Sequence, residues 1–162
     1  MEIIKKDRPQ RPLLLWFLGI CTMLDEAMSI LCYTMFMLFP NIMQMATDKM
    51  LSMSYYQDDI YKEAFAAYLS VTPWQYALLL LASVAIFVGA FIMLVKMKQI
   101  GFHIYTIGQI VNFCIINFIV GGKLAAMNNI ASWIMQICII VLFATLLPFM
   151  KPLQEEEDNE LS

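Results

Sequence analysis

Charged side chains are scarce in this sequence. Only 14% of the 162 residues are Asp, Glu, Lys or Arg, whereas 61% are hydrophobic. Soluble domains carry about 25% charged residues, so this chain has too few charges to cover a surface that faces water. Lipid is therefore the expected solvent for much of the chain, and the length suits a single compact unit.

Residue patterns for common catalytic chemistry are also missing. The sequence has one histidine, no HExxH metal motif, no glycine-rich phosphate loop and no nucleophile motif. Cys21, Cys32, Cys114 and Cys138 lie in apolar segments without a CxxC pair, which indicates small apolar packing residues. No basic surface suits nucleic acid. We therefore expect no enzyme, metal, cofactor or nucleic-acid partner. Acid catalysis inside the membrane by carboxylates alone is the remaining enzymatic alternative.

Long apolar runs dominate what is present. Four of them reach the length of about 20 residues that crosses a bilayer as a helix. They cover residues 13–39, 74–95, 100–120 and 130–149. The first run is too long for the apolar region of a cleaved signal peptide, and no small-residue cleavage site follows it. Thr72-Pro73 predicts a helix start, and Gly121-Gly122 predicts a helix end. The expected fold is all-α: a polytopic membrane protein with a four-transmembrane-helix bundle over residues 13–150.

The loop at residues 40–72 contains two amphipathic patterns. In the first, one side of a helix holds Ile42, Met43, Met45, Ala46, Met50 and Met53, and the other holds Gln44, Thr47, Asp48 and Ser52. In the second, Ile60, Tyr61, Ala64, Tyr68 and Val71 lie opposite Asp59, Lys62 and Glu63. These patterns predict amphipathic helices that lie on the bilayer or cap the bundle. The methionine-rich side could alternatively be a binding surface.

Lysine and arginine are distributed unevenly between the two ends of the predicted bundle. One end has Lys5, Lys6, Arg8 and Arg11 in the arm at residues 1–12, together with Lys96, Lys98 and Lys151. The other end has only Lys49, Lys62 and Lys123. The positive-inside rule therefore places both termini in the cytoplasm and the loop at residues 40–72 outside. The acidic tail at residues 151–162 is expected to be a solvated cytoplasmic segment, with docking of a basic partner as an alternative.

Two adjacent acids, Asp25 and Glu26, lie in the middle of the first run. A charge at the bilayer centre costs about 2.5–3.5 kcal/mol on insertion scales, so at least one acid is expected to be protonated and both to face protein or water. On a helical wheel, an arc of about 120° holds Thr22, Asp25, Glu26, Ser29, Cys32 and Tyr33. An alternative span at residues 27–46 would move the acids to an interface but would enclose Pro40.

The third run carries polar residues that could partner these acids. His103, Thr106, Gln109 and Asn112 recur at every third position, and Asn117 follows. Matched depth predicts that Gln109 and Asn112 contact Asp25 or Glu26, forming a binding site or proton path. The supporting polar network comprises Thr22, Ser29, Tyr33, Thr106, Asn117 and Gln136. The second run has no strong polar group, and its Ala82, Ala85 and Gly89 permit close packing. The alternative is a purely structural network that determines which helices meet.

Two stretches carry a resemblance to a known group of proteins. The arm RPQRPLLLWFLGICTML, followed later by KQIGFHIYTIGQI, resembles small four-helix membrane proteins of unknown function from Bacteroidota. The resemblance extends over most of the chain. It implies a multi-pass protein of the bacterial inner membrane and carries no activity over to this chain.

Two functions remain open at this point. The first is a non-enzymatic subunit or assembly factor that holds a larger membrane protein or a second copy of itself. The second is a small transporter or proton-coupled path built around Asp25 and Glu26. The first is favoured, because transporter sites are usually marked by broken helices or repeats, and neither is visible in the sequence.

Overall fold

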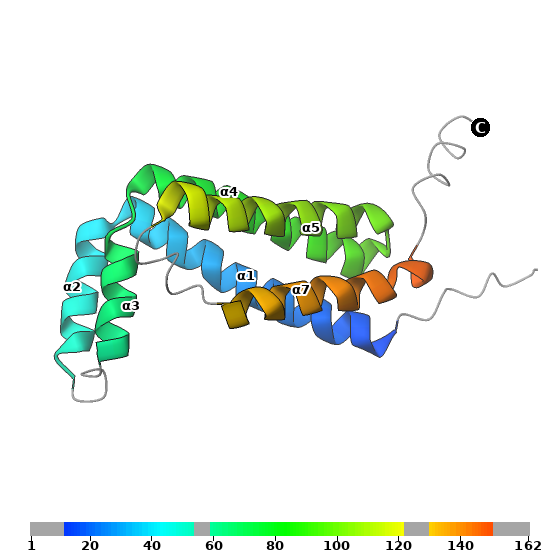
Figure 1. The fold of residues 1–162 in the computed structure, drawn as a ribbon, viewed down its shortest axis with the longest axis horizontal. Coiled ribbons are helices and arrows are strands. Elements are labelled where there is room, and N and C mark those ends of the chain that lie inside the picture. The colour runs from blue at the N-terminus through cyan, green and yellow to red at the C-terminus, as the bar shows by residue number, and fades with distance from the viewer. Residues whose placement is uncertain (1–11, 54–58, 122–129, 151–162) are drawn as a thin grey trace, which may run out of the picture.

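The computed structural model describes residues 12–53, 59–121 and 130–150, and every regular element in these ranges is helical (Figure 1). The α-helices are α1 (Leu13–Leu38), α2 (Pro40–Leu51), α3 (Asp59–Leu69), α4 (Pro73–Phe91), α5 (Gln99–Cys114) and α7 (Ile130–Thr145). π-Helical turns extend α4 over Ile92–Lys96 and α5 over Ile115–Val120, and a 3-10 turn at Leu147–Phe149 follows α7. The all-α prediction is confirmed for the described residues.

Three helical segments are long and apolar enough to cross a membrane. They are Leu13–Leu38, Pro73–Lys96 and Gln99–Val120, and each agrees with its predicted span to within one residue at either end. α1 ends at Leu38 and α2 begins at Pro40, which excludes the alternative span through Pro40. The chain is therefore a helical membrane protein.

The fourth predicted span is shorter in the structure than in the sequence interpretation. α7 has 16 residues, which corresponds to a length of about 24 Å, and a hydrocarbon core is about 30 Å thick. The α-helix ends at Thr145 because Pro148 lacks the N–H that would bond to the carbonyl of Ala144. The 3-10 turn at Leu147–Phe149 lengthens the apolar segment beyond this point.

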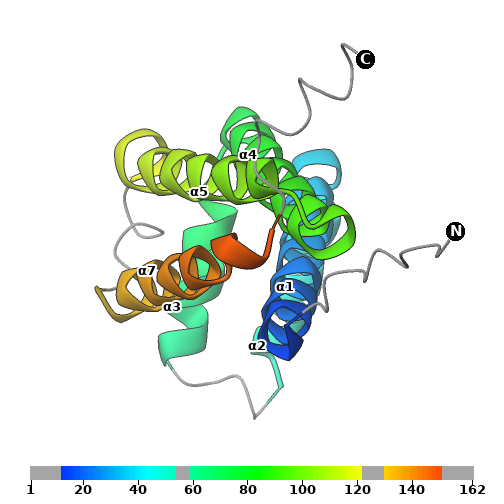
Figure 2. The same cartoon turned by 90° about the vertical axis from the view of Figure 1, so that its right-hand side faces the viewer.

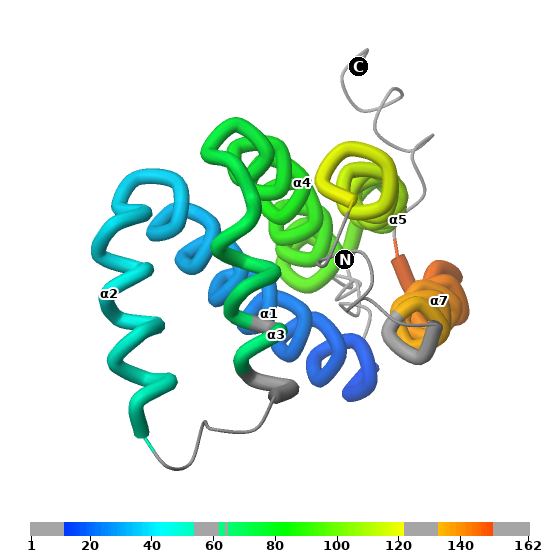
Figure 3. The backbone as a smooth tube through the Cα atoms, turned by 60° about the vertical axis from the view of Figure 1, so that its left-hand side comes forward, coloured from blue at the N-terminus to red at the C-terminus, as the bar shows by residue number. Residues whose placement is uncertain are grey.

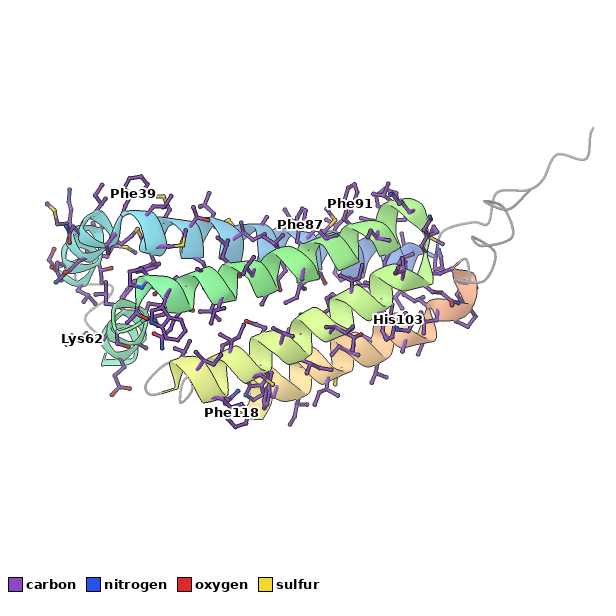
Figure 4. The ribbon with its side chains drawn as sticks, turned by 90° about the horizontal axis from the view of Figure 1, so that it is seen from above. Phe39, Lys62, Phe87, Phe91, His103 and Phe118 are labelled. Atoms are coloured by element: carbon purple, nitrogen blue, oxygen red, sulfur yellow. The ribbon has the colours of Figure 1, made fainter. Side chains whose placement is uncertain are left out.

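α4 is the central helix of the bundle. It packs against α1 on one side and against α5 on the other, and α7 makes fewer contacts with α1 and α5 (Figure 2). One buried cluster contains Leu15, Ile86, Met93, Tyr105 and Phe143, and a second contains Phe36, Val71, Tyr76, Leu79 and Ile115. Phe91 and Phe118 point away from the bundle (Figure 4), as expected of side chains that face lipid.

Close packing of α4 on α5 depends on two glycines. A Cβ atom added to Gly89 would lie 2.8 Å from the carbonyl oxygen of Gly101, and one added to Gly101 would lie 2.7 Å from the carbonyl oxygen of Gly89. The predicted small-residue stripe is confirmed at Ala82 and Gly89, which are both buried. Small side chains thus allow the two backbones to touch.

The predicted helix ends are present. Thr72 and Gln75 form a reciprocal capping box at the start of α4, with the Thr72 backbone N–H donating to Oε1 of Gln75 at 2.9 Å. Gly121 ends the third span with φ +57°, a value that glycine adopts without strain.

α2 and α3 lie side by side across one end of the bundle (Figure 3). The Tyr76 hydroxyl on α4 donates a hydrogen bond to the backbone carbonyl of Tyr68 and so ties α3 to the bundle. The amphipathic pattern did not predict which side of α2 faces the bundle: Thr47 is buried and Met43 and Met50 are half-buried, whereas Ile42 and Met45 are exposed. In a membrane, apolar side chains can face the lipid as well as the protein core. A helical wheel therefore shows which residues share a side of the helix, but not which side contacts protein.

Candidate functional site

The two adjacent acids of α1 face different surroundings. Glu26 is only 7% exposed and points toward the helices packed on α1, whereas Asp25 is exposed. Consecutive residues of an α-helix are about 100° apart, so one acid can face the packed interior while its neighbour faces an open side. The predicted polar arc is therefore divided into an inner part and an outer part.

Glu26 lies against α4 and near α5. The Ser83 side chain of α4, which is 2% exposed, is hydrogen-bonded to the Glu26 carboxyl. Tyr105 of α5 lies within electrostatic range of Glu26, and Nε2 of Gln109 donates a hydrogen bond to the Tyr105 hydroxyl at 3.3 Å. Glu26 therefore bonds to α4, and its interaction with the Tyr105–Gln109 pair of α5 is electrostatic.

This arrangement corrects the expected direct contact between an acid and Gln109 or Asn112. Oε2 of Glu26, Oε1 of Gln109 and Oδ1 of Asn112 are buried without a hydrogen-bond partner among the described residues, as is Oγ1 of Thr106. The physical reason is the order of packing: α4 lies between α1 and α5, so a serine of α4 reaches the acid first. A buried polar atom without a partner costs about 1–3 kcal/mol, so the bundle interior favours a protonated carboxyl that can donate.

An open cavity lies between the C-terminal half of α1 and the α2–α3 pair. This cavity, which we name the outer cavity after the predicted topology, has a volume of about 360 Å³. Its lining consists of Asp25, Met28, Ser29, Cys32, Tyr33, Phe36, Met43, Ala46, Thr47, Met50, Phe65 and Tyr68. Along α1 it extends from Asp25 to Phe36, which is about 16 Å at 1.5 Å per residue. The carboxyl of Asp25 therefore lies at the inner end of a mostly apolar cavity.

Aromatic rings form the outer part of this cavity wall. The ring of Phe36 stacks on that of Tyr68 with centroids 5.9 Å apart, and the Tyr33 and Tyr76 centroids are 6.0 Å apart. Burial raises the pKa of Tyr68 above its usual value, so its hydroxyl stays neutral. Tyr33 lines the outer cavity and also lies within electrostatic range of Glu26.

The remaining predicted residues are dispersed. Ser29 lines the outer cavity, and Gln109 and Gln136 line a second cavity of about 200 Å³ between α5 and α7. Thr22 of α1 is half-buried. Asn117 donates to the backbone carbonyl of Phe113 on its own helix, at 2.9 Å. The structure thus brings Gln109 and Gln136 together, whereas the hydrogen bond of Asn117 stays within its own helix.

Sequence reasoning missed Ser83 and Tyr105. Ser83 is a single small hydroxyl within the apolar stretch LLLASVAI, which gives almost no polar signal. Tyr105 lies beside the polar row that contains Thr106 and Gln109, and its ring is 1% exposed. A search for hydroxyl groups at the depth of Glu26 would have found both residues.

No metal site is formed within the described ranges, because no three His, Cys, Asp or Glu side chains there gather closely enough to hold an ion. No protein-family model, curated protein or solved structure matches this chain. Functional inference therefore depends on the geometry around Asp25 and Glu26.

Proposed function

We propose that this chain is a small transporter or proton-coupled path of the bacterial inner membrane, built around Asp25 and Glu26. The supporting observation is the position of the two acids. Asp25 lines the open outer cavity, and Glu26, the next residue, is buried between α1, α4 and α5. A pair of carboxyls at the boundary of a cavity and a packed interior can pass a proton between them.

The resting form of Glu26 is the neutral acid, because an ionised carboxyl at mid-membrane is costly. Protons from the outer cavity reach Asp25 first and then Glu26. Ser83 is hydrogen-bonded to Glu26, and Tyr33 and Tyr105 lie within electrostatic range of it. Each carries a hydroxyl that can both accept and donate a hydrogen bond, as a proton relay requires. Gln109 donates a hydrogen bond to the Tyr105 hydroxyl and so orients it, and the cavity that Gln109 lines between α5 and α7 would receive the proton.

The proposal includes four membrane crossings with both termini in the cytoplasm. α7 and its 3-10 turn supply the fourth crossing, and the Lys and Arg asymmetry sets the direction. α2 and α3 act as amphipathic helices that cap the outer end. The resemblance to four-helix Bacteroidota proteins is compatible with this topology and stays a prediction.

Proton flux in reconstituted vesicles tests the proposed path. Glu26→Gln keeps shape and hydrogen bonding but removes the proton that titrates, so flux down an imposed pH gradient should fall at least about tenfold. Asp25→Asn should reduce it by a smaller factor. Asp48→Asn, at an exposed acid of α2 outside the cavity lining, is the matched control and should retain parental flux. Parental flux in both Glu26→Gln and Asp25→Asn, or no flux in the parent protein, would overturn the proposal.

A second candidate is a non-enzymatic subunit or assembly factor of a larger membrane complex. α7 supports it, because this helix packs less extensively than α1, α4 and α5 and leaves Ile134, Met135 and Ile137 exposed. These exposed apolar side chains of α7 can pack against a helix of a partner protein in place of lipid. Purification in native lipid followed by mass spectrometry tests it. A larger membrane protein at fixed stoichiometry would favour the subunit, and its absence would favour the path.

A further inference from the structure

The outer cavity carries an unbalanced negative charge when Asp25 is ionised. None of the described residues that line it is Lys, Arg or His. The lining hydroxyls of Ser29, Tyr33, Thr47 and Tyr68 can hydrogen-bond a ligand but carry no positive charge. Because a carboxylate at this depth is expensive unless it is paired, the cavity favours an occupant that brings a cation.

The rest of the lining favours an apolar body on that cation. Phe36, Phe65 and the rings of Tyr33 and Tyr68 present aromatic faces, and three methionines add flexible, polarisable contacts. The volume of about 360 Å³ falls in the lower range of small-molecule pockets. The aromatic rings lie along the same side of α1 as Asp25, so one ligand can touch both.

We infer that the outer cavity binds a lipophilic organic monocation, with its charged head beside Asp25 and its apolar body against Phe36, Tyr68 and the methionines. This inference rests on the proposed function, for which it names the class of substrate. The single carboxylate sets the ligand charge at one. A bare metal ion would need more oxygen ligands than Asp25 and its neighbours provide, and an anion would be repelled.

Equilibrium dialysis of the purified full chain in detergent tests the inference without requiring transport. The probe is radiolabelled benzyltrimethylammonium, and the competitor is neopentylbenzene, which has the same shape with carbon in place of the charged nitrogen. The labelled cation should bind saturably, and the neutral competitor should displace it at least about tenfold less well than unlabelled cation does. Equal competition by both compounds would overturn the inference, because the cavity would then select only for apolar shape.

Variants locate the bound charge. Asp25→Asn should weaken binding of the cation at least about tenfold, and Asp48→Asn should leave it within about twofold of the parent. Equal weakening by both changes would show a general surface-charge effect and would contradict a site at Asp25.

A second measurement uses the unmodified protein and so does not depend on the folding of a variant. Cys32 lines the outer cavity, whereas Cys138 is exposed on α7 outside it. Saturating benzyltrimethylammonium should slow N-ethylmaleimide labelling of Cys32 at least about threefold and leave that of Cys138 unchanged, as measured by peptide mass spectrometry. Unchanged labelling of Cys32 would place the cation elsewhere.

The binding measurements and the flux experiment can have independent outcomes. Proton flux without cation binding would retain the proposed path and overturn its substrate class. Cation binding without proton flux would overturn the path and retain a membrane protein that binds lipophilic cations.

Discussion

At the scale of single residues, adjacency in sequence separates the two acids in space. The turn of about 100° per residue directs Glu26 toward Ser83 and directs Asp25 into the outer cavity. The same two residues thus provide one carboxyl that a ligand can reach and one that is enclosed by protein. Their separate surroundings explain how two adjacent acids can be tolerated in a membrane helix.

Removal of the Ser83 hydroxyl should weaken the α1–α4 contact. Ser83→Ala leaves the Glu26 carboxyl without its described partner, so we expect a loss of about 0.6 kcal/mol in unfolding free energy, up to about 1.7. Unfolding in mixed micelles measures this loss. Ser52→Ala is the control, because the Ser52 hydroxyl, at the C-terminal end of α2, donates to the nearby carbonyl of Lys49 and not to a residue of another helix within the described part of the chain. In a double-mutant cycle, Ser83→Ala should have little effect once Glu26→Leu, which cannot form a hydrogen bond, is present. If the losses in unfolding free energy of the two single variants simply add in the double variant, the Ser83–Glu26 hydrogen bond does not contribute.

The sequence predicted the position of the acids but not their partner. Hydropathy shows that Asp25 and Glu26 lie at mid-span, and the wheel shows which α1 residues share their arc. Which helix packs against the Glu26 side of α1 depends on how the helices are arranged in the bundle, and the periodicity of the sequence does not determine that arrangement. An amide such as Gln109 is a stronger sequence signal than Ser83, although Ser83 is the group that is hydrogen-bonded to Glu26.

At the scale of the helices, the α4–α5 contact is the most closely fitted one described. The backbone carbonyls of Gly89 and Gly101 each occupy the space where the other residue would carry a side chain. Backbone atoms cannot move aside as a flexible side chain can. The spacing of these two helices therefore depends on the absence of a methyl group at both positions.

Substitution of Gly89 tests this contact. A Cβ atom at Gly89 would meet backbone atoms, with Gly101 O at 2.8 Å, whereas one at Gly19 would meet only the Leu94 side chain, at 3.1 Å. Gly89→Ala should therefore lower the unfolding free energy by about 1–3 kcal/mol, and Gly19→Ala should be nearly neutral. Thermal unfolding in detergent compares the two variants. Equal losses would mean that helix propensity, rather than close contact, determines the result.

Local signals predicted the helix ends better than the helix orientations. Thr72 and Gly121 act through neighbouring atoms, so their residue types alone indicate a helix start and a helix end. The orientation of α2 depends on how the chain turns at Phe39 and Pro40, and on lipid as an alternative partner for apolar side chains. This is why Thr47 is buried and Met43 and Met50 are half-buried, whereas Ile42 and Met45 of the same methionine-rich side are exposed.

At the scale of the whole molecule, the number of crossings depends on α7. The start of α1, the turn between α4 and α5, and the end of α7 lie at the same end of the bundle (Figure 1). This arrangement fits four crossings, although α7 is about 24 Å long and the hydrocarbon core is about 30 Å thick. A short span can be accommodated by local thinning of the bilayer at modest cost.

Single cysteines at three positions determine the topology. In a background in which all native cysteines are replaced by serine, Met53→Cys should react with an impermeant thiol reagent from outside the cell, because the loop after α2 carries few cations. Lys96→Cys, at the turn between α4 and α5, and Asn159→Cys, in the acidic tail, should react only after the membrane is opened.

If α7 does not cross, Asn159→Cys will react from outside together with Met53→Cys, while Lys96→Cys stays protected. If the positive-inside assignment is reversed, Lys96→Cys and Asn159→Cys will react from outside and Met53→Cys will be protected. The three-position pattern therefore separates a missing fourth crossing, which leaves the cavity of Asp25 facing outward, from an inverted protein, in which protons would reach Asp25 from the cytoplasm.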